Sequence, residues 1–245
     1  MSAHRFHVPS AAPGTMELPE AARQHATRVI RLGVGDALRV FDAGFEFRAT
    51  IAVIEKHRVL IEVGAAVRGL PERPTPLHLI MSPLKGDLTE LVIQKATELG
   101  AARITPALFE RTDTVARREP TEARIERWNR VATSAAEQSG RCVMPAISQV
   151  MPLRQAMDSL GGLCEGEVRI VAAEPSIDAE SAGPSIPVKD VRTVVVAVGP
   201  AGGLSPSDLD LLTGAGFTRE RLALHTLRSE TACLAALAVL GARYP

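Results

Sequence analysis

The sequence predicts an α/β domain with a mostly parallel sheet, preceded by a small β-rich domain. Apolar runs alternate with helical patterns after Pro76, whereas the residues before Gly69 hold short β-rich runs. Between them, Gly69–Pro76 has three prolines in eight residues, a composition that fits neither a helix nor a central strand. We therefore place the domain boundary there and expect domains over residues 1–72 and 73–245.

The N-terminal domain is predicted to be a small β-barrel or antiparallel sheet. Its β-rich runs are Ala37–Phe41, Phe45–Ile54 and Val59–Val63, and the first two are separated by the turn-forming residues Asp42–Gly44. A short helical stretch over His25–Leu32 precedes them.

The C-terminal domain is predicted to alternate strands with helices. The predicted strands are Leu77–Met81, Ala102–Leu108, Val168–Ala173, Thr193–Gly199 and Leu222–His225. The predicted helices are Asp87–Leu99, Pro120–Ser139, one that Ser205 caps with Pro206 in its first position, and Glu230–Leu240. Two of the strands are continuously apolar, as in a sheet covered on both faces. The segment Pro175–Lys189, rich in Ser, Pro and Asp, predicts an exposed loop.

Composition limits the classes of function. The 28 Lys and Arg residues balance the 28 Asp and Glu residues, which excludes a strongly basic, DNA-coating protein. No apolar run is long enough to cross a membrane, and the N-terminus has no hydrophobic signal region. The three cysteines are far apart and form neither a disulfide framework nor a metal-binding pair, so we expect a reducing cytoplasm and no metal.

Charge is spread unevenly along the chain. Residues 1–70 hold nine basic and seven acidic side chains, and residues 103–141 hold eight and six. Residues 151–190 hold three and seven. The first two segments either build a basic face for RNA or are ordinary solvated surface.

Two motifs carry the chemistry. In Val198–Asp208 an apolar strand runs into three glycines and then a capped helix, at the carboxyl end of a strand, where open α/β sheets bind ligands. The motif lacks the P-loop lysine and the dinucleotide fingerprint, which disfavours a nucleotide-dependent oxidoreductase. In Leu227–Ala232, Arg228 precedes the last helix and Ser229 is its predicted cap. Taken singly, each motif is equally well a tight turn or a helix cap without a ligand.

Together with two further blocks, these motifs resemble the 16S ribosomal RNA uridine-N3 methyltransferase family, a SPOUT-class group. The further blocks are Lys85–Gly100, continuing to Arg111, and Ala136–Arg141. Arg5–His7 and the β-rich runs resemble the PUA-like RNA-binding domain of that family. The resemblance implies a C-terminal α/β domain with a trefoil knot, a homodimer, S-adenosylmethionine as cofactor, and ribosomal RNA of the small subunit as substrate.

The resemblance also implies site residues. The cofactor-binding residues it implies are Val198, Gly199, Pro200, Gly202, Gly203, Leu222, Leu224, Leu227, Glu230, Thr231 and Ala232. Arg228 is the candidate for stabilising negative charge on the uracil, and Glu137 is the second catalytic candidate. By their position in the sequence, candidate RNA-binding residues are Arg5, His25, Arg28, Arg31, Lys85, Arg111, Gln138 and Arg141. A solvent-exposed face is the equal alternative for His25, Arg28 and Arg31, as is a solvated helix terminus for Glu137, Gln138 and Arg141.

The chain departs from the family pattern at two places. Ala201 stands where the family has Glu, and Ala223–His225 replaces a Gly-Pro-Arg segment. Two alternatives therefore stay open: the same fold acting on another RNA base, and an RNA-binding or ribosome-assembly protein that no longer methylates. Trp128 and His78 fall on apolar patterns and are expected in the core, with a dimer contact as the alternative for Trp128.

Overall fold

The computed structural model describes residues 4–118, 121–173 and 190–245, and its contacts divide the chain into two compact units. Unit 1 comprises the chain up to Glu72 together with Thr133–Met144, and unit 2 comprises Arg73–Ala132 and Pro145–Pro245. The sequence placed the domain boundary between residues 72 and 73, but it did not indicate that residues 133–144 pack with the N-terminal part.

Unit 1 is built on a five-stranded sheet with the order β1-β3-β4-β5-β2. The strands are β1 (Arg5–His7), β2 (Gly14–Glu17), β3 (Ala37–Asp42), β4 (Phe45–Ile54) and β5 (Val59–Arg68). A two-residue turn joins β3 to β4, with positive φ at Ala43 and Gly44, as tight hairpins require. β1 pairs with β3 in parallel while the other pairs are antiparallel, so the sheet is mixed.

A helical segment covers the core of this sheet. Helix α1 (Glu20–Gln24) continues into the π-helical turn η1 (His25–Ile30), and Arg31 ends it in the left-handed region at φ 65°. Ala22 and Ala26 face inward and pack against strand side chains such as Phe6 and Ile61. The predicted helical stretch over residues 25–32 is therefore present, but it begins five residues earlier.

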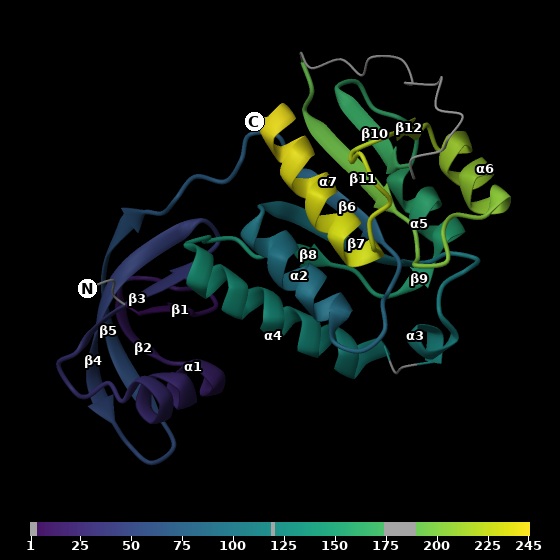
Figure 1. Cartoon of the computed structure of the whole chain (residues 1–245). Helices are drawn as coiled ribbons and strands as arrows, with labels where there is room; N and C mark the ends of the chain where they lie inside the picture. The colour runs from purple at the N-terminus through teal and green to yellow at the C-terminus, as the bar shows by residue number, and fades with distance from the viewer. Residues whose placement is uncertain (1–3, 119–120, 174–189) are drawn as a thin grey trace. The chain divides into compact units, whose positions relative to one another are not determined.

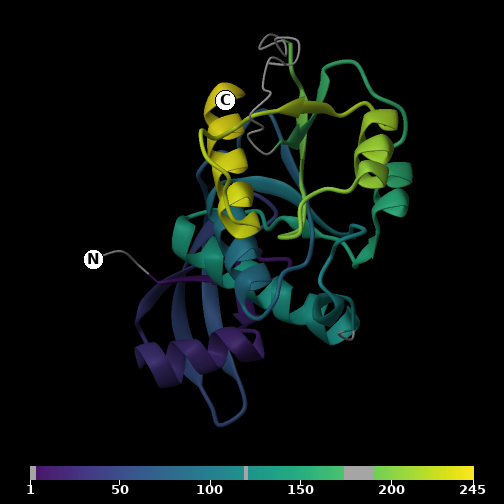
Figure 2. The same ribbon diagram turned by 45° about the vertical axis from the view of Figure 1, so that its right-hand side comes forward.

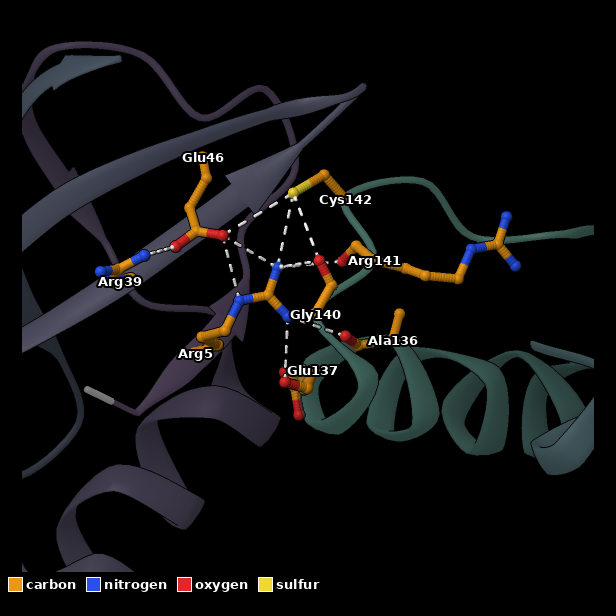
Figure 3. Close-up of polar contacts among 8 residues, drawn as sticks. All are labelled: Arg5, Arg39, Glu46, Ala136, Glu137, Gly140, Arg141 and Cys142. Carbon is orange, nitrogen blue, oxygen red and sulfur yellow. Dashed lines mark hydrogen bonds and ion pairs between the residues drawn. The ribbon is translucent and has the colours of Figure 1, made fainter. Parts of the chain in front are cut away.

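The C-terminal end of helix α4 (Thr121–Ser139) belongs to unit 1, where Arg5 caps it (Figure 3). The Arg5 guanidinium donates to the carbonyl oxygens of Ala136 and Glu137 through Nη1, at 2.8 and 3.0 Å, and to those of Gly140 and Arg141 through Nη2, at 3.1 and 3.0 Å. A helix end leaves such carbonyls without partners inside the helix. Arg5 therefore ties β1 to residues that lie more than a hundred positions away in the sequence.

Unit 2 contains a seven-stranded sheet in which every pairing between described strands is parallel. Its order is β12-β10-β11-β6-β7-β8, and β9 also pairs with β7. The strands are β6 (Leu77–Met81), β7 (Ala101–Leu108), β8 (Ala146–Ile147), β9 (Met151–Pro152), β10 (Glu167–Ala172), β11 (Thr193–Val198) and β12 (Thr218–Glu220). The predicted mostly parallel α/β domain is confirmed.

Helices cover both faces of this sheet (Figures 1 and 2). On one face, α2 (Leu88–Glu98), α7 (Ser229–Arg243) and the Trp128 side of α4 pack on alternate strand residues such as Leu79 and Val196. On the other face, α5 (Leu153–Leu160) and α6 (Pro206–Gly214) pack on the intervening residues, among them Ile80 and Val195. Two apolar faces explain why β10 and β11 read as continuous apolar runs.

The predicted and observed elements differ at several places in unit 2. The strand predicted over Leu222–His225 is wrong, because that segment is irregular and the strand is the preceding β12. Helix α3 (Thr114–Arg118) was not predicted. Pro120 and the predicted loop 175–189 lie outside the described residues. Trp128 is 1% exposed, as a core position requires. Buried His78 places Nε2 2.8 Å from the Thr105 hydroxyl, as expected of a satisfied core histidine.

Candidate active site

A cavity of about 790 Å³ lies at the carboxyl ends of β10 and β11 in unit 2. Its walls combine the end of β10, the glycine-rich loop after β11 and the turn that begins α7. The lining residues are Leu88, Arg111, Val171, Ala172, Ala173, Val198, Gly199, Pro200, Ala201, Gly202, Gly203, Leu204, Leu209, Arg219, Thr226, Leu227, Arg228, Ser229, Glu230 and Ala232. This is the edge at which open parallel sheets bind ligands.

The glycine-rich loop forms one wall because side chains do not fit there. A Cβ atom at Gly199 would lie 2.8 Å from Cδ2 of Leu204, and one at Gly202 would lie 3.2 Å from Cβ of Arg111. Gly203 has φ +74° and donates its N–H to the carbonyl oxygen of Pro200 at 2.9 Å. The loop therefore exposes backbone groups toward the cavity.

Helix α6 follows this loop and is firmly capped. Ser205 accepts a hydrogen bond from the amide of Asp208 at 3.1 Å, and the Asp208 carboxylate accepts one from the Ser205 amide at 3.0 Å. This reciprocal arrangement is a capping box, with Pro206 in the first turn. The cap predicted for Ser205 is confirmed, and it fixes the exit of the glycine-rich loop.

The start of α7 contacts the glycine-rich loop directly. Arg228 is the N-cap residue of α7, and the hydroxyl of Ser229 donates to the carbonyl oxygen of Gly199 at 3.1 Å. The prediction that Ser229 caps the helix is therefore wrong: this hydroxyl joins two distant segments instead. Because of this bond, the two motifs singled out in the sequence meet at one cavity.

The loop after β7 supports the glycine-rich loop from the other side. Arg111 Nη1 donates to the carbonyl oxygen of Gly202 at 3.2 Å, and the amide of Glu110 donates to the Asp208 carboxylate at 3.1 Å. The Ser207 hydroxyl donates to Glu110 at 2.5 Å, and this bond, with one from Ser205, lowers the pKa of the Glu110 carboxyl. The glycine-rich loop is thus held between β7 and α6.

Comparison with known proteins identifies the family. Residues 71–241 match the RNA methyltransferase domain, and residues 18–64 match the RNA methyltransferase PUA domain. The chain belongs to this RNA methyltransferase family. The first match covers most of the sequence and includes the whole of the cavity wall.

Members of the family resemble the chain over nearly its whole length. The ribosomal RNA small subunit methyltransferase E of Synechocystis is 31% identical over 236 residues, which are 93% of this chain and 73% of the relative. That of Bacillus subtilis is 30% identical, covering 89% of this chain and 86% of the relative. The crystal structure of the Neisseria gonorrhoeae methyltransferase E, bound to S-adenosylmethionine, has a TM-score of 0.84 at 28% identity and covers 99% and 98% of the two chains. A Legionella pneumophila methyltransferase with the same cofactor gives 0.83 at 28% identity, with the same coverage.

The cavity gathers most of the residues for which the family resemblance implies cofactor binding. Those in its wall are Val198, Gly199, Pro200, Gly202, Gly203, Leu227, Glu230 and Ala232. Leu222 lines a small pocket that shares Leu227 and Ala232 with the main cavity. Leu224 is 70% exposed and, like Thr231, is not part of the wall.

Three of the candidate polar residues have internal partners in unit 1. Arg5 uses all three guanidinium nitrogens on protein groups, caps the end of α4 and also lies 4.5 Å from the ring centre of Phe41. Arg141 is 8% exposed and makes a bidentate ion pair with Glu72. Glu137 accepts the amide of His7 at 3.1 Å, and burial raises the pKa of its carboxyl although that amide and nearby charges oppose the shift.

The remaining RNA candidates lie on surfaces. His25, Arg28, Arg31 and Gln138 are exposed in unit 1. In unit 2, Lys85 is exposed and pairs with Asp113 at 2.9 Å, while Arg111 lines the cavity. Sequence reasoning missed Arg219 and the end of β10. Since the carboxyl ends of neighbouring parallel strands share an edge, the β10 residues could have been expected there; nothing in the sequence indicated that Arg219 would be beside them.

Proposed function

We propose that the chain methylates N3 of a uridine in 16S ribosomal RNA, with S-adenosylmethionine as the methyl donor. The observation that carries the proposal is the meeting of the glycine-rich loop and the Arg228 turn at one cavity, fastened by the bond from Ser229 to Gly199. The curated relatives named above are small-subunit ribosomal RNA methyltransferases, and two similar structures hold S-adenosylmethionine.

The residues of the cavity suit this cofactor. A Cβ atom at Gly199 or Gly202 would crowd Leu204 or Arg111, so the loop keeps its close backbone path along the cavity wall. Ala172, Leu227 and Ala232 offer apolar surface for an adenosine. We propose that the backbone of residues 199–203 and of the turn before α7 holds the cofactor. Ala201 stands where the family pattern has Glu and lies in the same wall. With Ala at this position, Gly199 still lies against Leu204 and Gly202 against Arg111.

When bound, S-adenosylmethionine supplies a methyl group activated by the positive charge on sulfur. The chain then has to align the uracil and favour loss of its N3 proton. Arg228 is exposed and lines the cavity, and its side chain forms no hydrogen bond or ion pair with any residue the structure describes. Its guanidinium is thus available to stabilise the negative charge that develops on the uracil oxygens.

Replacing Arg228 tests this role. We expect Arg228→Gln to lower kcat by about 100-fold while the Kd for S-adenosylmethionine changes less than about threefold, and Arg228→Lys to recover part of the loss. Methyl transfer to 16S RNA or small subunits gives kcat, and calorimetry gives Kd. The control is Arg192→Gln, an exposed arginine at the amino end of β11.

Two results would contradict parts of the proposal. Wild-type turnover in Arg228→Gln would remove Arg228 from catalysis. A wild-type chain that binds neither S-adenosylmethionine nor its demethylated product would favour the alternative of an RNA-binding or ribosome-assembly protein.

The partners belong to the same proposal. His25, Arg28 and Arg31 are exposed along α1–η1 and its end, and we propose that they contact RNA phosphates. We also propose a homodimer. The apolar side chains of Leu88 and Leu91 on α2 are 37% and 39% exposed, and a second copy of the chain would cover them. Leu88 also lines the cavity, so such a contact would lie beside the proposed active site. The trefoil knot and a cytoplasmic location belong to this proposal too. Separately, among the described residues no helix is long and apolar enough to span a membrane, and no group of side chains could hold a metal ion.

A further inference from the structure

Arg219 is a charged residue of the cavity that the proposed reaction does not use. It is the central residue of β12, the edge strand of the unit 2 sheet, and stands next to Val171 of β10 in the parallel register. Both residues line the cavity. Arg219 is exposed, and its side chain forms no hydrogen bond or ion pair with any residue in the described ranges.

The other charged residues of the wall have assignments. Arg111 donates to the Gly202 carbonyl oxygen and supports the loop, and the guanidinium of Arg228, the N-cap residue of α7, is proposed to act on the uracil. Glu230 is the acidic residue of this wall, and it likewise has no ion pair among the described residues. Arg219 and Glu230 are thus opposite charges facing one cavity without pairing with each other.

The strand that carries Arg219 is held in place. Thr218, Arg219 and Glu220 are in register with Ile170–Ala172 of β10. Glu220 forms an ion pair with Arg243 of α7, the helix that begins with the Arg228 turn. The backbone at Arg219 is therefore fixed at the cavity edge, and only its side chain has to become ordered when a ligand binds.

From this arrangement we propose that Arg219 binds the α-carboxylate of S-adenosylmethionine, and that Glu230 provides the negative charge for its α-ammonium group. The inference rests on the proposed function, because it concerns the amino-acid part of the same cofactor. Such a zwitterion needs one group of each sign, and a guanidinium matches a carboxylate through two parallel hydrogen bonds. Arg219 would then be a binding residue that separates carboxylated ligands from those lacking the group.

Calorimetric titration of the full chain with two ligands tests the proposal. The ligands are S-adenosylmethionine and its decarboxylated analogue, and the variants are wild type, Arg219→Gln and the control Arg192→Gln. We expect wild type to bind S-adenosylmethionine about tenfold more tightly than the analogue. Arg219→Gln should weaken S-adenosylmethionine by about tenfold and leave the analogue unchanged, so that the preference disappears, while Arg192→Gln matches wild type. Circular dichroism confirms that each variant is folded.

Each other outcome overturns the proposal. If Arg219→Gln keeps the wild-type preference for the carboxylated ligand, Arg219 does not bind the carboxylate. If cofactor affinity is unchanged but the KM for RNA rises and becomes less salt-dependent, the guanidinium binds an RNA phosphate instead. If wild type binds neither ligand, the proposed function itself fails. If it binds both equally, only the present inference does.

Discussion

Arg5 has a role that its sequence context does not reveal. Arg5–His7 and the β-rich runs that follow resemble a PUA-like RNA-binding domain, which predicts an RNA contact for Arg5. In unit 1 the guanidinium also donates to the carboxylate of Glu46, which in addition pairs with Arg39. Burial alone would raise the pKa of Glu46, but hydrogen bonds and charge from Arg39 and Arg5 outweigh it and lower the pKa. The partners lie too far along the chain to be recognised from local pattern.

A comparison of Arg5 with Arg39 measures how much this burial matters. Arg5→Lys keeps the charge but loses the fork that reaches four carbonyl oxygens, and we expect the free energy of unfolding to fall by about 2–4 kcal/mol. The matched control is Arg39→Lys, which alters the same Glu46 from a side chain that is 44% exposed; it should cost less than about 1 kcal/mol. Urea denaturation followed by circular dichroism gives both values. Equal losses would show that Arg5 is no more than a surface ion-pair partner.

Predictions of strands and helices succeeded where a buried face defines the pattern and at the Ser205 cap, whereas the cap predicted at Ser229 was wrong. The apolar runs of β10 and β11 and the Ser205 cap are visible because burial and orphan amides constrain residue type. The failure at Leu222–His225 has the opposite cause. Strand β12 has the polar sequence Thr-Arg-Glu, and it is a strand because it pairs with β10, a contact that local sequence does not contain. The candidate site divides in the same way: the loop of residues 199–203 was predicted, and Arg219 was not.

The glycine-rich loop has no room for a side chain at its first residue, Gly199. In Gly199→Ala the new methyl group would lie within 3 Å of the Leu204 side chain, so Leu204 or the loop must move. We expect the Kd for S-adenosylmethionine to rise by about tenfold or more, with a loss of about 1–3 kcal/mol in stability. Calorimetry and thermal unfolding measure the two effects.

The matched control is Gly214→Ala in helix α6. A Cβ atom there has no neighbour within 4 Å, and alanine favours a helix over glycine by up to about 1 kcal/mol. This variant should bind the cofactor as wild type does and be at least as stable. If Gly199→Ala also binds normally, the close approach of the loop is not needed for the cofactor.

For the whole molecule, the sequence indicated two parts but not how they share the chain. The proline-rich segment near residue 72 is a local signal, whereas the packing of residues 133–144 with unit 1 depends on Arg5 and on the Arg141–Glu72 pair. The strand order of the unit 2 sheet likewise rests on pairings between distant segments. The family could be predicted because several motifs occur in a fixed order and spacing. Hydrophobic periodicity alone indicates helices and strands but not a family.

Buried His78 should make the stability of the molecule depend on pH. Burial, with help from Arg103, lowers the pKa of His78 from 6.5 to about 4, so the folded state holds the imidazole neutral. The unfolded chain binds a proton at His78 more readily than the folded chain does. The contribution of His78 to the free energy of unfolding is therefore fully present above about pH 6.5 and is lost as the pH falls toward 4. The full shift corresponds to about 3 kcal/mol. His78→Leu lacks the titrating group, so its free energy of unfolding should fall less between pH 7 and pH 4.5 than that of wild type. At pH 7 the variant should be about 1 kcal/mol less stable, because Thr105 loses its hydrogen-bond partner. Urea denaturation at the two pH values measures the difference, with the exposed His57→Leu as control; parallel pH profiles for wild type and His78→Leu would show that His78 is protonated without cost in the folded state.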